Sequence, residues 1–357
     1  MEKSQDQAIR ENAGRARLRR EKPYVLEKIL KYEEKHAKGE FTPILEFIYD
    51  HKCNMKCTHC CNAKYEKREQ SLTPASVKNV ADQADELGIA QLSISGGEPL
   101  LFDDFDEIVK AIDPQRFHIS VSTNGFFLTE EKAKHLKAIG IDKVKVSVDS
   151  IDEKIYEKTR LQKGVNKAIE ALFNAKKAGL QAVVQTVVSH QTCQTEQTEK
   201  LAQFCQDNEF NLDILIARAI GNWEGKEDVL IDEDDAQYLL NMHKKYPVLH
   251  RDTFPTYDEV EGSCGAVKKI MVITKYGDVL PCVFMHIGLG NIFEEPLKDI
   301  MQRGLTIKHF ANKNPKCLSG EDKEFIKDHM SKFYNRALPV DYKEIFVEDD
   351  FITKEEK

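Results

Sequence analysis

The sequence predicts an α/β protein whose strands run parallel. From residue 44 onward, short apolar runs alternate with amphipathic segments of helical spacing. Strands that alternate with helices in this way are usually parallel and are joined by right-handed crossovers. Polar residues follow several of the runs, at the strand ends where parallel α/β barrels bind their ligands. Together these observations predict a ligand site at one edge of the sheet.

Six runs rich in apolar and β-branched residues are the expected strands. They cover residues 44–49, 92–95, 117–121, 144–148, 182–188 and 212–216. Short apolar runs bounded by turn residues are typical of buried strands. Six strand-and-helix units are too few for a closed barrel of the common kind, which needs eight.

Three of the helices between these strands have clear start and stop signals. Thr73 is the expected N-cap of the first, Pro74 fits its first turn, and Gly88 can adopt the left-handed conformation that ends it. A second helix is expected over 129–140 and a third over 165–179, each ending at a glycine. Before residue 44 the chain is polar and helix-prone, so we expect helices packed outside the main domain.

Composition narrows the class of protein. The chain has 357 residues, of which 41% are hydrophobic and 31% charged, and this length suits one large domain or two. No apolar stretch approaches the ~20 residues that span a bilayer, and the first residues lack a signal peptide. We therefore expect a cytoplasmic protein with no membrane partner. The net charge of −8 argues against a nucleic-acid partner.

Three of the nine cysteines form a short ligand pattern. Cys53, Cys57 and Cys60 have C-x3-C-x2-C spacing directly after the apolar run 44–48. In a reducing compartment, cysteines are better explained as metal ligands and free thiols than as disulfides. Three thiolates leave one iron of a four-iron cluster free to bind a reactant, whereas structural iron–sulfur and zinc sites usually have four protein ligands. The spacing alone also allows a zinc site.

Three polar segments downstream make the pattern specific. They are GGEP at 96–99, STNG at 122–125 and SVDS at 147–150, each at the end of an expected strand. With the cysteine loop, this series resembles radical S-adenosylmethionine (SAM) enzymes over about 45–220. The resemblance implies a partial (β/α)6 barrel, open on one side for a large substrate. It also implies a [4Fe–4S] cluster held by the three cysteines, with SAM bound to its free iron.

The resemblance assigns further residues to SAM binding. They are Gly96, Gly97, Glu98, Pro99, Thr123, Asn124, Ser147, Asp149 and Arg160. The two glycines would let the backbone approach the methionyl end of SAM, because they carry no side chain. Glu98 would accept a charge-assisted hydrogen bond from the methionyl ammonium group. Arg160 would pair with the SAM carboxylate, and the alternative is a surface ion pair with Glu157.

A second group of cysteines lies nearer the C-terminus. The runs 270–274 and 279–282 predict a β-hairpin, which can bring Cys264 and Cys282 close together. The segment resembles the first half of the SPASM or twitch extensions of radical SAM enzymes, which carry auxiliary iron–sulfur clusters. The resemblance implies a second, auxiliary cluster held by Cys264, Cys282 and Cys317. The alternative is that these cysteines are buried free thiols.

Some residues near these cysteines have roles that the sequence leaves open. The fourth position of the auxiliary cluster could be taken by substrate, by water, or by a histidine such as His286 or His309. Cys61 directly follows the last cysteine of the loop. It is a candidate hydrogen donor in catalysis, and the alternative is that it only packs. Cys193 and Cys205 are lesser candidates for the same role.

The same reasoning divides the chain into five parts. They are a helical N-terminal extension (1–43), a radical SAM partial barrel (44–220), a linker with a helix (221–260), a small hairpin-plus-helix domain of the SPASM or twitch type for the auxiliary cluster (261–335) and an acidic C-terminal tail (336–357). The acidic run within the linker is expected to be the solvated start of its helix rather than a metal site.

The resemblance also implies a reaction. The reduced cluster would split SAM into methionine and a 5′-deoxyadenosyl radical, which takes a hydrogen atom from the substrate. An oxidoreductase, either a dehydrogenase or an epimerase, acting on a small molecule or sugar-like alcohol is the preferred function, with an external electron donor such as flavodoxin or ferredoxin.

Two other functions stay open. The first is a maturase that modifies a peptide or protein side chain, although the N-terminal extension is short for a leader-binding domain. The second is a non-catalytic iron–sulfur protein that binds or transfers electrons. An electron carrier would not need the GGEP segment or the polar strand ends, since it has no SAM to bind.

Overall fold

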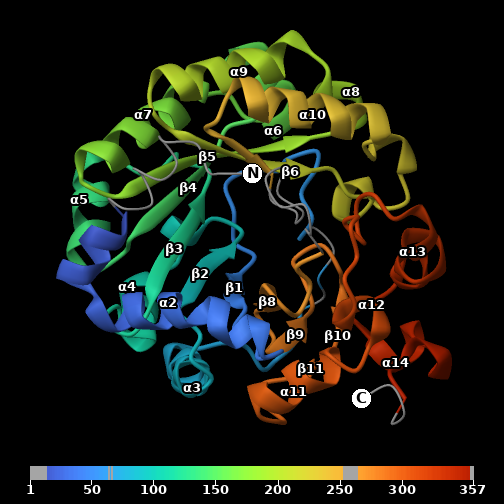
Figure 1. Ribbon diagram of the computed structural model, residues 1–357. Coiled ribbons are helices and arrows are strands. Elements are labelled where there is room, and N and C mark those ends of the chain that lie inside the picture. Colours follow the sequence, from blue (N-terminus) through green and yellow to red (C-terminus); the bar gives the residue numbers. More distant parts are fainter. Residues whose placement is uncertain (1–13, 63–64, 66, 252–263, 354–357) are drawn as a thin grey trace.

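The structure is a computed structural model that describes residues 14–62, 65, 67–251 and 264–353 (Figure 1). Ten strands form one sheet in the order β11-β9-β8-β1-β2-β3-β4-β5-β6-β7. These are β1 (Ile44–Asp50), β2 (Gln91–Gly96), β3 (His118–Thr123), β4 (Lys143–Ser147), β5 (Gln181–Val188), β6 (Asn211–Ile216), β7 (Leu249–Arg251), β8 (Ile270–Ile273), β9 (Asp278–Leu280) and β11 (Gly290–Asn291). A separate two-stranded sheet pairs β10 (Ile287–Gly288) with β12 (Val340–Asp341). From β1 to β7 every pair is parallel.

Helices cover the outside of the curved sheet (Figure 1). The α-helices are α2 (Pro23–Ala37), α3 (Pro74–Glu86), α4 (Phe105–Ile112), α5 (Glu130–Ala138), α6 (Glu153–Arg160), α7 (Val165–Lys177), α8 (His190–Cys193), α9 (Glu196–Asp207), α10 (Glu233–Lys245), α11 (Leu297–Gly304), α12 (Lys308–Ala311), α13 (Lys323–Asp328) and α14 (Tyr342–Ile345). Short 3-10 helices are η1 (Pro99–Leu101), η2 (Gly221–Trp223), η3 (Glu227–Val229), η4 (Met330–Phe333) and η5 (Glu348–Asp350).

The predicted strands and helices are confirmed to within a residue or two. The six expected strands are β1 to β6, and the three expected helices are α3, α5 and α7. Thr73 caps α3 as expected, because its side-chain oxygen accepts a hydrogen bond from the backbone N–H of Ser76. Strands β1 to β6 with their outer helices form the predicted partial barrel.

The two faces of the curved sheet differ in polarity. On β4, Val144 and Val146 are fully buried in the hydrophobic core, whereas Lys145 between them lines a cavity on the other face. On β6, Asp213 likewise lines that cavity between two buried apolar residues. Successive side chains of a strand point to opposite faces, so the apolar set packs against the helices and the polar set faces the barrel interior.

Two segments differ from the expectation. Within 221–260, where the sequence predicts a linker with one helix, α10 is present but β7 also pairs with β6. A strand of three residues is too short to show a periodic pattern. Within 336–357, where the sequence predicts an acidic tail, the described part contains β12, α14 and η5 and buries Ile345 and Phe346. A few well-spaced apolar residues anchor this segment despite its charge.

The C-terminal region spans the open side of the barrel. Beyond β1, the sheet continues into this region, because β8 pairs in parallel with β1. At the other edge, Arg251 of β7 forms an ion pair with Glu321. Figure 1 shows this region in orange and red, between β1 and β6. The barrel interior is therefore bounded by β1 to β7 on one side and by the C-terminal region on the other.

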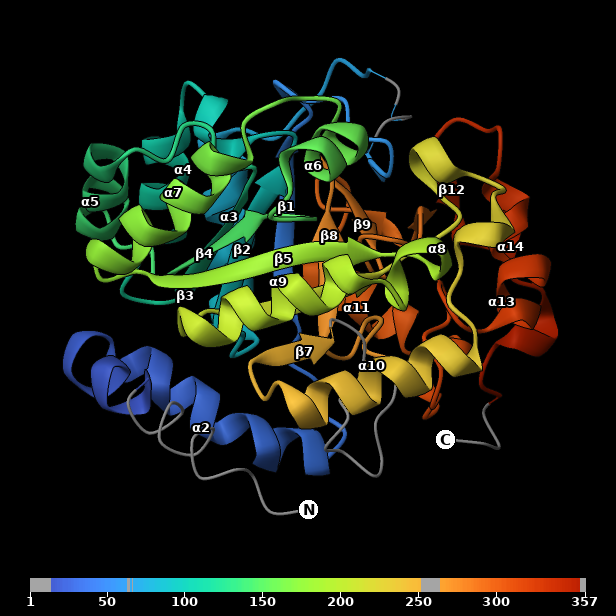
Figure 2. The same cartoon turned by 90° about the horizontal axis from the view of Figure 1, so that it is seen from above.

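Helix α2 lies beneath the barrel, at the end where the strands begin (Figure 2). Just before it, Lys22 donates hydrogen bonds to the carbonyl oxygens of Phe117 (3.1 Å) and Gly140 (2.9 Å). It also forms a buried 2.5 Å ion pair with Asp142. These partners precede β3 and β4, so the N-terminal helix closes the end of the barrel opposite the polar strand ends.

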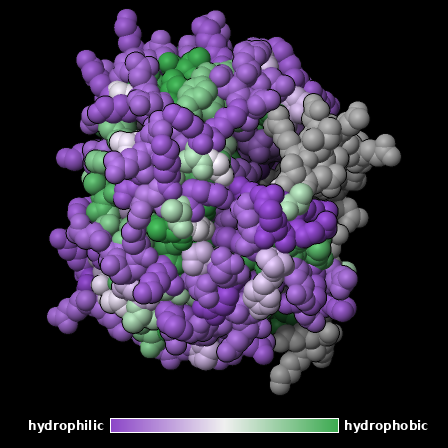
Figure 3. All heavy atoms as spheres, turned by 90° about the vertical axis from the view of Figure 1, so that its left-hand side faces the viewer, coloured by the Kyte–Doolittle hydropathy of each residue, from purple (hydrophilic) through white to green (hydrophobic). Residues whose placement is uncertain are grey.

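Hydrophobic side chains on the surface are scattered. On the face drawn in Figure 3, hydrophobic residues form small patches separated by hydrophilic ones. Among the described residues, no helix combines the length and the apolar character needed to cross a bilayer. All nine cysteines lie in the described ranges and are free, as the sequence predicts.

Candidate active site

One cavity of about 940 Å³ occupies the barrel interior. Residues from β1 to β8 line it, together with residues of the C-terminal region. Both cysteine groups reach this same cavity, and the lining cysteines are Cys53, Cys57, Cys60, Cys61, Cys264, Cys282 and Cys317. The two cysteine groups are about two hundred residues apart in the sequence. Their spacing does not predict that both line the same cavity.

The cysteine loop follows β1 and is held by contacts to its backbone. The N–H of Cys60 donates to the carbonyl oxygen of Cys57 (3.2 Å). The N–H of Thr58 donates to the carbonyl oxygen of Thr159, near the C-terminal end of α6 (3.0 Å). Burial raises the pKa of Cys53, and the neighbouring Cys57 and Cys60 raise it further. Three mutually close thiols on one loop are the donor set that a four-iron cluster needs when it keeps one iron open.

Gly96 and Gly97 pack directly against this loop. A Cβ at Gly96 would lie 2.1 Å from the carbonyl oxygen of Asp50, and one at Gly97 would lie 2.2 Å from that of Lys52. The N–H of Gly97 also donates to the Asp50 carbonyl (2.7 Å). The glycines are thus required by the close approach of the cysteine loop. Their contact with the methionyl end of SAM stays a prediction.

We expect Gly97→Ala to displace the cysteine loop. The added methyl group would collide with backbone atoms, which cannot rotate away, so overpacking should cost about 1–3 kcal/mol of unfolding free energy. Iron per chain and the thermal midpoint should both fall, as measured by metal analysis and calorimetry. Gly14→Ala is the control, because nothing lies within 4 Å of that position. Full iron and an unchanged midpoint in Gly97→Ala would contradict this account.

Glu98 follows β2 and links it to the end of β3. Its carboxylate is fully buried and accepts hydrogen bonds from the Thr123 hydroxyl (2.6 Å) and from the N–H of Asn124 (2.7 Å). Burial raises its pKa. Thr123 and Asn124 line the cavity, and Glu98 is not among the described residues that do. The structure therefore gives Glu98 a positioning role, while its direct bond to the methionyl ammonium stays a prediction.

Asn124 and Pro99 support the same corner of the site. The Asn124 side-chain amide donates to Asn54 in the cysteine loop (2.7 Å), so the third strand end is tied to the loop. Pro99 begins η1, is buried, and directly follows Glu98. These contacts fix the order cysteine loop, GGEP segment and STNG segment around one rim, as the sequence predicts.

Arg160 is buried and pairs with Asp149, not with Glu157. The Arg160 Nε lies 2.6 Å from Asp149 Oδ2, and its Nη1 lies 3.7 Å from the Cys57 sulfur. Burial alone would raise the pKa of Asp149, but the Arg160 guanidinium holds it below its ordinary value. The surface ion pair is thus excluded. Arg160 and Ser147 line the cavity, and the pairing of Arg160 with the SAM carboxylate stays a prediction.

The segment η2 is part of the site, although the sequence predicts only a linker there. The Asn222 backbone N–H donates to the Cys60 carbonyl (3.1 Å), and its side-chain amide donates to the Cys57 carbonyl (2.9 Å). A Cβ at Gly221 would lie 2.2 Å from the Cys60 oxygen. The Trp223 ring faces His59, with centroids 5.7 Å apart. Its position could have indicated this role, because the segment follows the end of the sixth strand, as the other polar segments follow the ends of theirs.

The C-terminal cysteines converge as the resemblance implies. Strands β8 and β9 form the predicted hairpin. Burial and the nearby Cys317 raise the pKa of Cys264 to about 11, and burial also raises that of Cys282. The Arg218 guanidinium donates to the Cys317 sulfur (3.6 Å). Three close thiols facing the cavity fit an iron–sulfur cluster with one position open to other ligands.

Neither histidine proposed as a fourth ligand is among the described residues that line the cavity. His286 is fully buried and packs edge-on against Tyr65. His309 instead hydrogen-bonds Asp350 in the C-terminal segment (3.1 Å). Within the described ranges, the fourth position is thus left to another group.

The remaining cysteines divide between the site and the core. Cys61 lines the cavity, and burial raises its pKa, so the thiol is protonated at neutral pH. Its roles as a hydrogen donor or a packing group both stay predictions. Cys193 and Cys205 are buried in the hydrophobic core and are not among the described lining residues.

Comparison with known proteins identifies two regions. The family model of the radical SAM superfamily matches residues 48–205, and the model of the SPASM iron–sulfur cluster-binding domain matches residues 264–319. The matched regions contain the first and second cysteine groups, respectively.

Named relatives cover part of the chain. A probable GTP 3′,8-cyclase of Methanocella arvoryzae is 31% identical over 50% of this chain and 58% of its own length. Another from Methanosarcina acetivorans is 26% identical over 68% of this chain and 78% of its own length. Mycofactocin maturase MftC of Mycolicibacterium smegmatis is 26% identical over 70% of this chain and 67% of its own length.

Solved structures share the fold. Streptococcus suis SuiB bound to precursor peptide SuiA superposes with a TM-score of 0.59 and 19% identity, over 77% of this chain and 69% of that one. The native anSMEcpe structure with bound AdoMet superposes with a TM-score of 0.58 and 18% identity, over 85% of this chain and 95% of that one. These likenesses support the α/β partial barrel.

Proposed function

Because the chain belongs to the radical SAM superfamily and carries a SPASM-type domain, we propose that it is a maturase that modifies a peptide or protein side chain. The superfamily membership means that it is a radical SAM enzyme with a [4Fe–4S] cluster, SAM and an auxiliary iron–sulfur cluster. The oxidoreductase on a sugar-like alcohol that the sequence favours has no support among the named relatives.

We assign one metal group to each of the two cysteine groups that line this cavity. When bound, the first cluster and SAM supply a 5′-deoxyadenosyl radical that takes a hydrogen atom from the substrate, and the auxiliary cluster can accept an electron or bind a substrate group. Cys53, Cys57 and Cys60 would hold the first cluster, and Cys264, Cys282 and Cys317 would hold the second. The chain's own contribution is to orient the substrate between them and to exclude other hydrogen donors.

One observation carries the proposal: a single cavity faces both cysteine groups. A side chain that entered it would lie between the source of the radical and a group able to accept the second electron. The cavity volume, about 940 Å³, is near the upper end for pockets that bind one small ligand, and SAM and both clusters would fill part of it. The remaining space suits one residue of a longer chain. The likeness to mycofactocin maturase supports the same reading.

A nucleotide cyclase is the second candidate, and the charge of the cavity favours it. Lys145, Arg218, Arg251 and Lys269 line the cavity, and such groups suit phosphate. Arg251 already pairs with Glu321, however, and the Arg218 guanidinium stacks on the Phe284 ring at 3.8 Å. The likeness to probable GTP 3′,8-cyclases also supports this second candidate.

The test compares substrates on anaerobically reconstituted enzyme with SAM and a reductant such as flavodoxin. Short peptides encoded beside the gene are compared with GTP and with a sugar alcohol. We expect a peptide to raise the rate of 5′-deoxyadenosine formation at least about tenfold, equivalent to ~1.4 kcal/mol in the barrier. The mass of the peptide should change. When the peptide carries deuterium at the modified residue, that deuterium should appear in 5′-deoxyadenosine. Stimulation by GTP alone, with a cyclised product, would replace this proposal with the second candidate.

A further inference from the structure

Two histidines and one aspartate meet in the C-terminal region, outside the cavity already described. His309 comes from α12, His329 directly follows α13, and Asp350 ends η5. Each offers one ligand atom, and these atoms all lie within 4.8 Å of one another. We call these three residues the C-terminal triad. They bring together segments that are twenty or more residues apart in the sequence.

His309 and Asp350 are hydrogen-bonded, and the spacing of the three ligand atoms also leaves room for a shared ion. Asp350 Oδ1 lies 3.1 Å from His309 Nε2 and 3.9 Å from His329 Nε2. Zinc bonds of ~2.1 Å at tetrahedral angles place neighbouring ligand atoms about 3.4 Å apart. The observed distances lie on either side of that value, so small side-chain rotations would be enough to accommodate the ion.

His329 contributes a ligand atom that makes no hydrogen bond within the triad. Its side chain is buried, and its ring donates toward the Ile345 carbonyl. Its Nε2 faces Asp350 at a distance beyond hydrogen-bond reach. Nε2 therefore makes no hydrogen bond with Asp350, and a neutral imidazole nitrogen of this kind can bind a metal ion.

The surroundings hold the triad in place. Asp350 Oδ2 accepts a hydrogen bond from the backbone N–H of Val347 (2.8 Å), so Oδ1 is the oxygen turned toward the two rings. Phe325 and Phe346 pack around both histidines, with centroids 4.9 Å and 5.1 Å from that of His329. Support of a carboxylate ligand by a backbone N–H is typical of metal sites.

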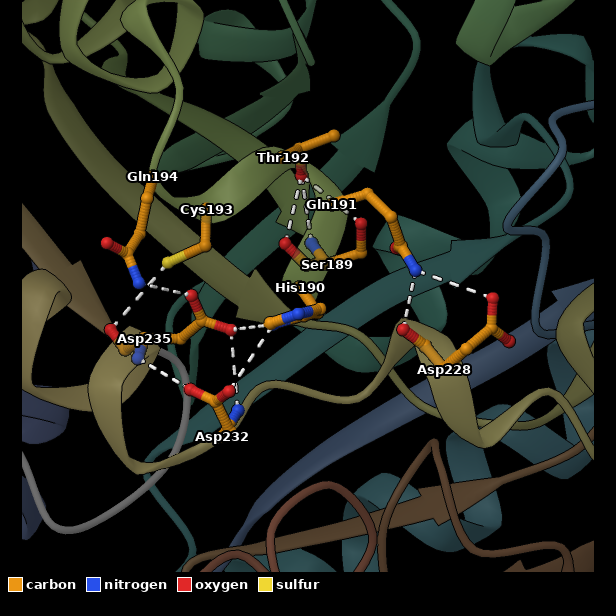
Figure 4. A network of polar contacts seen from close by, with 9 residues as sticks. All are labelled: Ser189, His190, Gln191, Thr192, Cys193, Gln194, Asp228, Asp232 and Asp235. Atoms are coloured by element: carbon orange, nitrogen blue, oxygen red, sulfur yellow. Dashed lines mark hydrogen bonds and ion pairs between the residues drawn. The ribbon is translucent and has the colours of Figure 1, made fainter.

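A second group of similar composition is explained without an ion. His190, Asp232 and Asp235 also lie within ligand range of one another. Figure 4 shows that Asp235 already bonds His190 (2.6 Å) and Gln194 (2.9 Å). Asp232 caps α10 by accepting from the N–H of Asp235. That network is saturated by hydrogen bonds, whereas the C-terminal triad is not.

We propose that the C-terminal triad binds one zinc ion through His309, His329 and Asp350, with water in the fourth position. His309 is partly exposed, so solvent can reach the triad. Two imidazoles, one carboxylate and water form a ligand set that zinc accepts. The site is separate from the two cysteine groups and uses none of their residues.

The ion would anchor the C-terminal segment to the auxiliary-cluster region. The segment reaches the cavity wall through β12, because the N–H of Val340 donates to the His286 carbonyl (3.0 Å) and β12 pairs with β10. Met285, next to His286, lines the cavity. A zinc ion at the triad thus stabilises the outer support of that wall.

The experiment uses cluster-loaded, anaerobically purified full-length protein, in which the cysteines are occupied by iron. The protein is equilibrated with zinc chloride, desalted, and analysed for zinc and iron by mass spectrometry. We expect one zinc per chain in the wild type and at least a tenfold lower content in Asp350→Asn, His309→Gln and His329→Gln, at equal iron. Zinc should also raise the thermal midpoint of the wild type and leave that of Asp350→Asn unchanged.

The matched control is His135→Gln. His135 forms a similar pair with Asp106 (2.8 Å) but stands outside any three-residue group in the described ranges, so zinc content should not change. If His329→Gln fails to fold, the half-exposed His309→Gln and the near-isosteric Asp350→Asn still decide the question. No zinc in the wild type, or equal zinc in wild type and variants, would overturn the proposal.

Discussion

Replacing Cys53, Cys57 and Cys60 together with Ala is expected to abolish SAM cleavage. The three thiols come from one loop and face one cavity, and the other cysteines that line it in the described structure are Cys61 beside them and the three of the C-terminal region. Without them the variant cannot hold the cluster that supplies the electron, so 5′-deoxyadenosine should fall below detection. Chromatography of anaerobic reactions with SAM and dithionite measures this product.

The control for that variant is Cys205→Ala, which removes a thiol buried in the core away from the cavity. It should keep SAM cleavage near the wild-type rate, even if its thermal midpoint falls. Normal cleavage by the triple variant would contradict the assignment of the cysteine loop, and with it the place of SAM at this rim.

Replacing Cys264, Cys282 and Cys317 with Ala is expected to separate SAM cleavage from product formation. The variant should lose about four irons, the content of one cluster, and still form 5′-deoxyadenosine slowly in the absence of turnover. Conversion of the substrate should stop, because the radical formed on it would have no electron acceptor or anchoring iron beside it. Metal analysis, electron paramagnetic resonance of the reduced protein and mass spectrometry of the substrate measure the three effects.

The result for this second variant is informative only if the variant folds, since the three cysteines pack into the C-terminal region. Circular dichroism and retained SAM cleavage show that the barrel is intact. Unchanged iron in a folded variant would remove the auxiliary cluster from the site. Full conversion of substrate at reduced iron would show instead that the cluster is structural.

Much of the barrel could be predicted because its signals are local. Apolar runs predict β1 to β6, and the N-cap at Thr73 together with Gly88 predicts α3. The polar segments at strand ends gave the rim, since parallel strands bring such ends together. Strand β7 is not predicted because three residues carry no period, and η2 is not predicted because glycines such as Gly221 and Gly225 are typical of a linker.

The partners of buried charges could not be predicted in the same way. Arg160 is three residues after Glu157, a spacing that suggests a helix-surface pair, yet the fold places it against Asp149. Glu98 follows two glycines, but the structure buries it between two strand ends. Such choices depend on which elements become neighbours, and that information is non-local.

The most direct test of two clusters in one cavity is the iron and sulfide content of reconstituted protein. Wild type is measured beside the Cys53/Cys57/Cys60 variant and the Cys264/Cys282/Cys317 variant. Two four-iron clusters predict about eight irons and eight sulfides per chain in the wild type, and about four of each in either variant. About four irons in the wild type, with none in the first variant and no loss in the second, would contradict the account by leaving the C-terminal cysteines without a cluster.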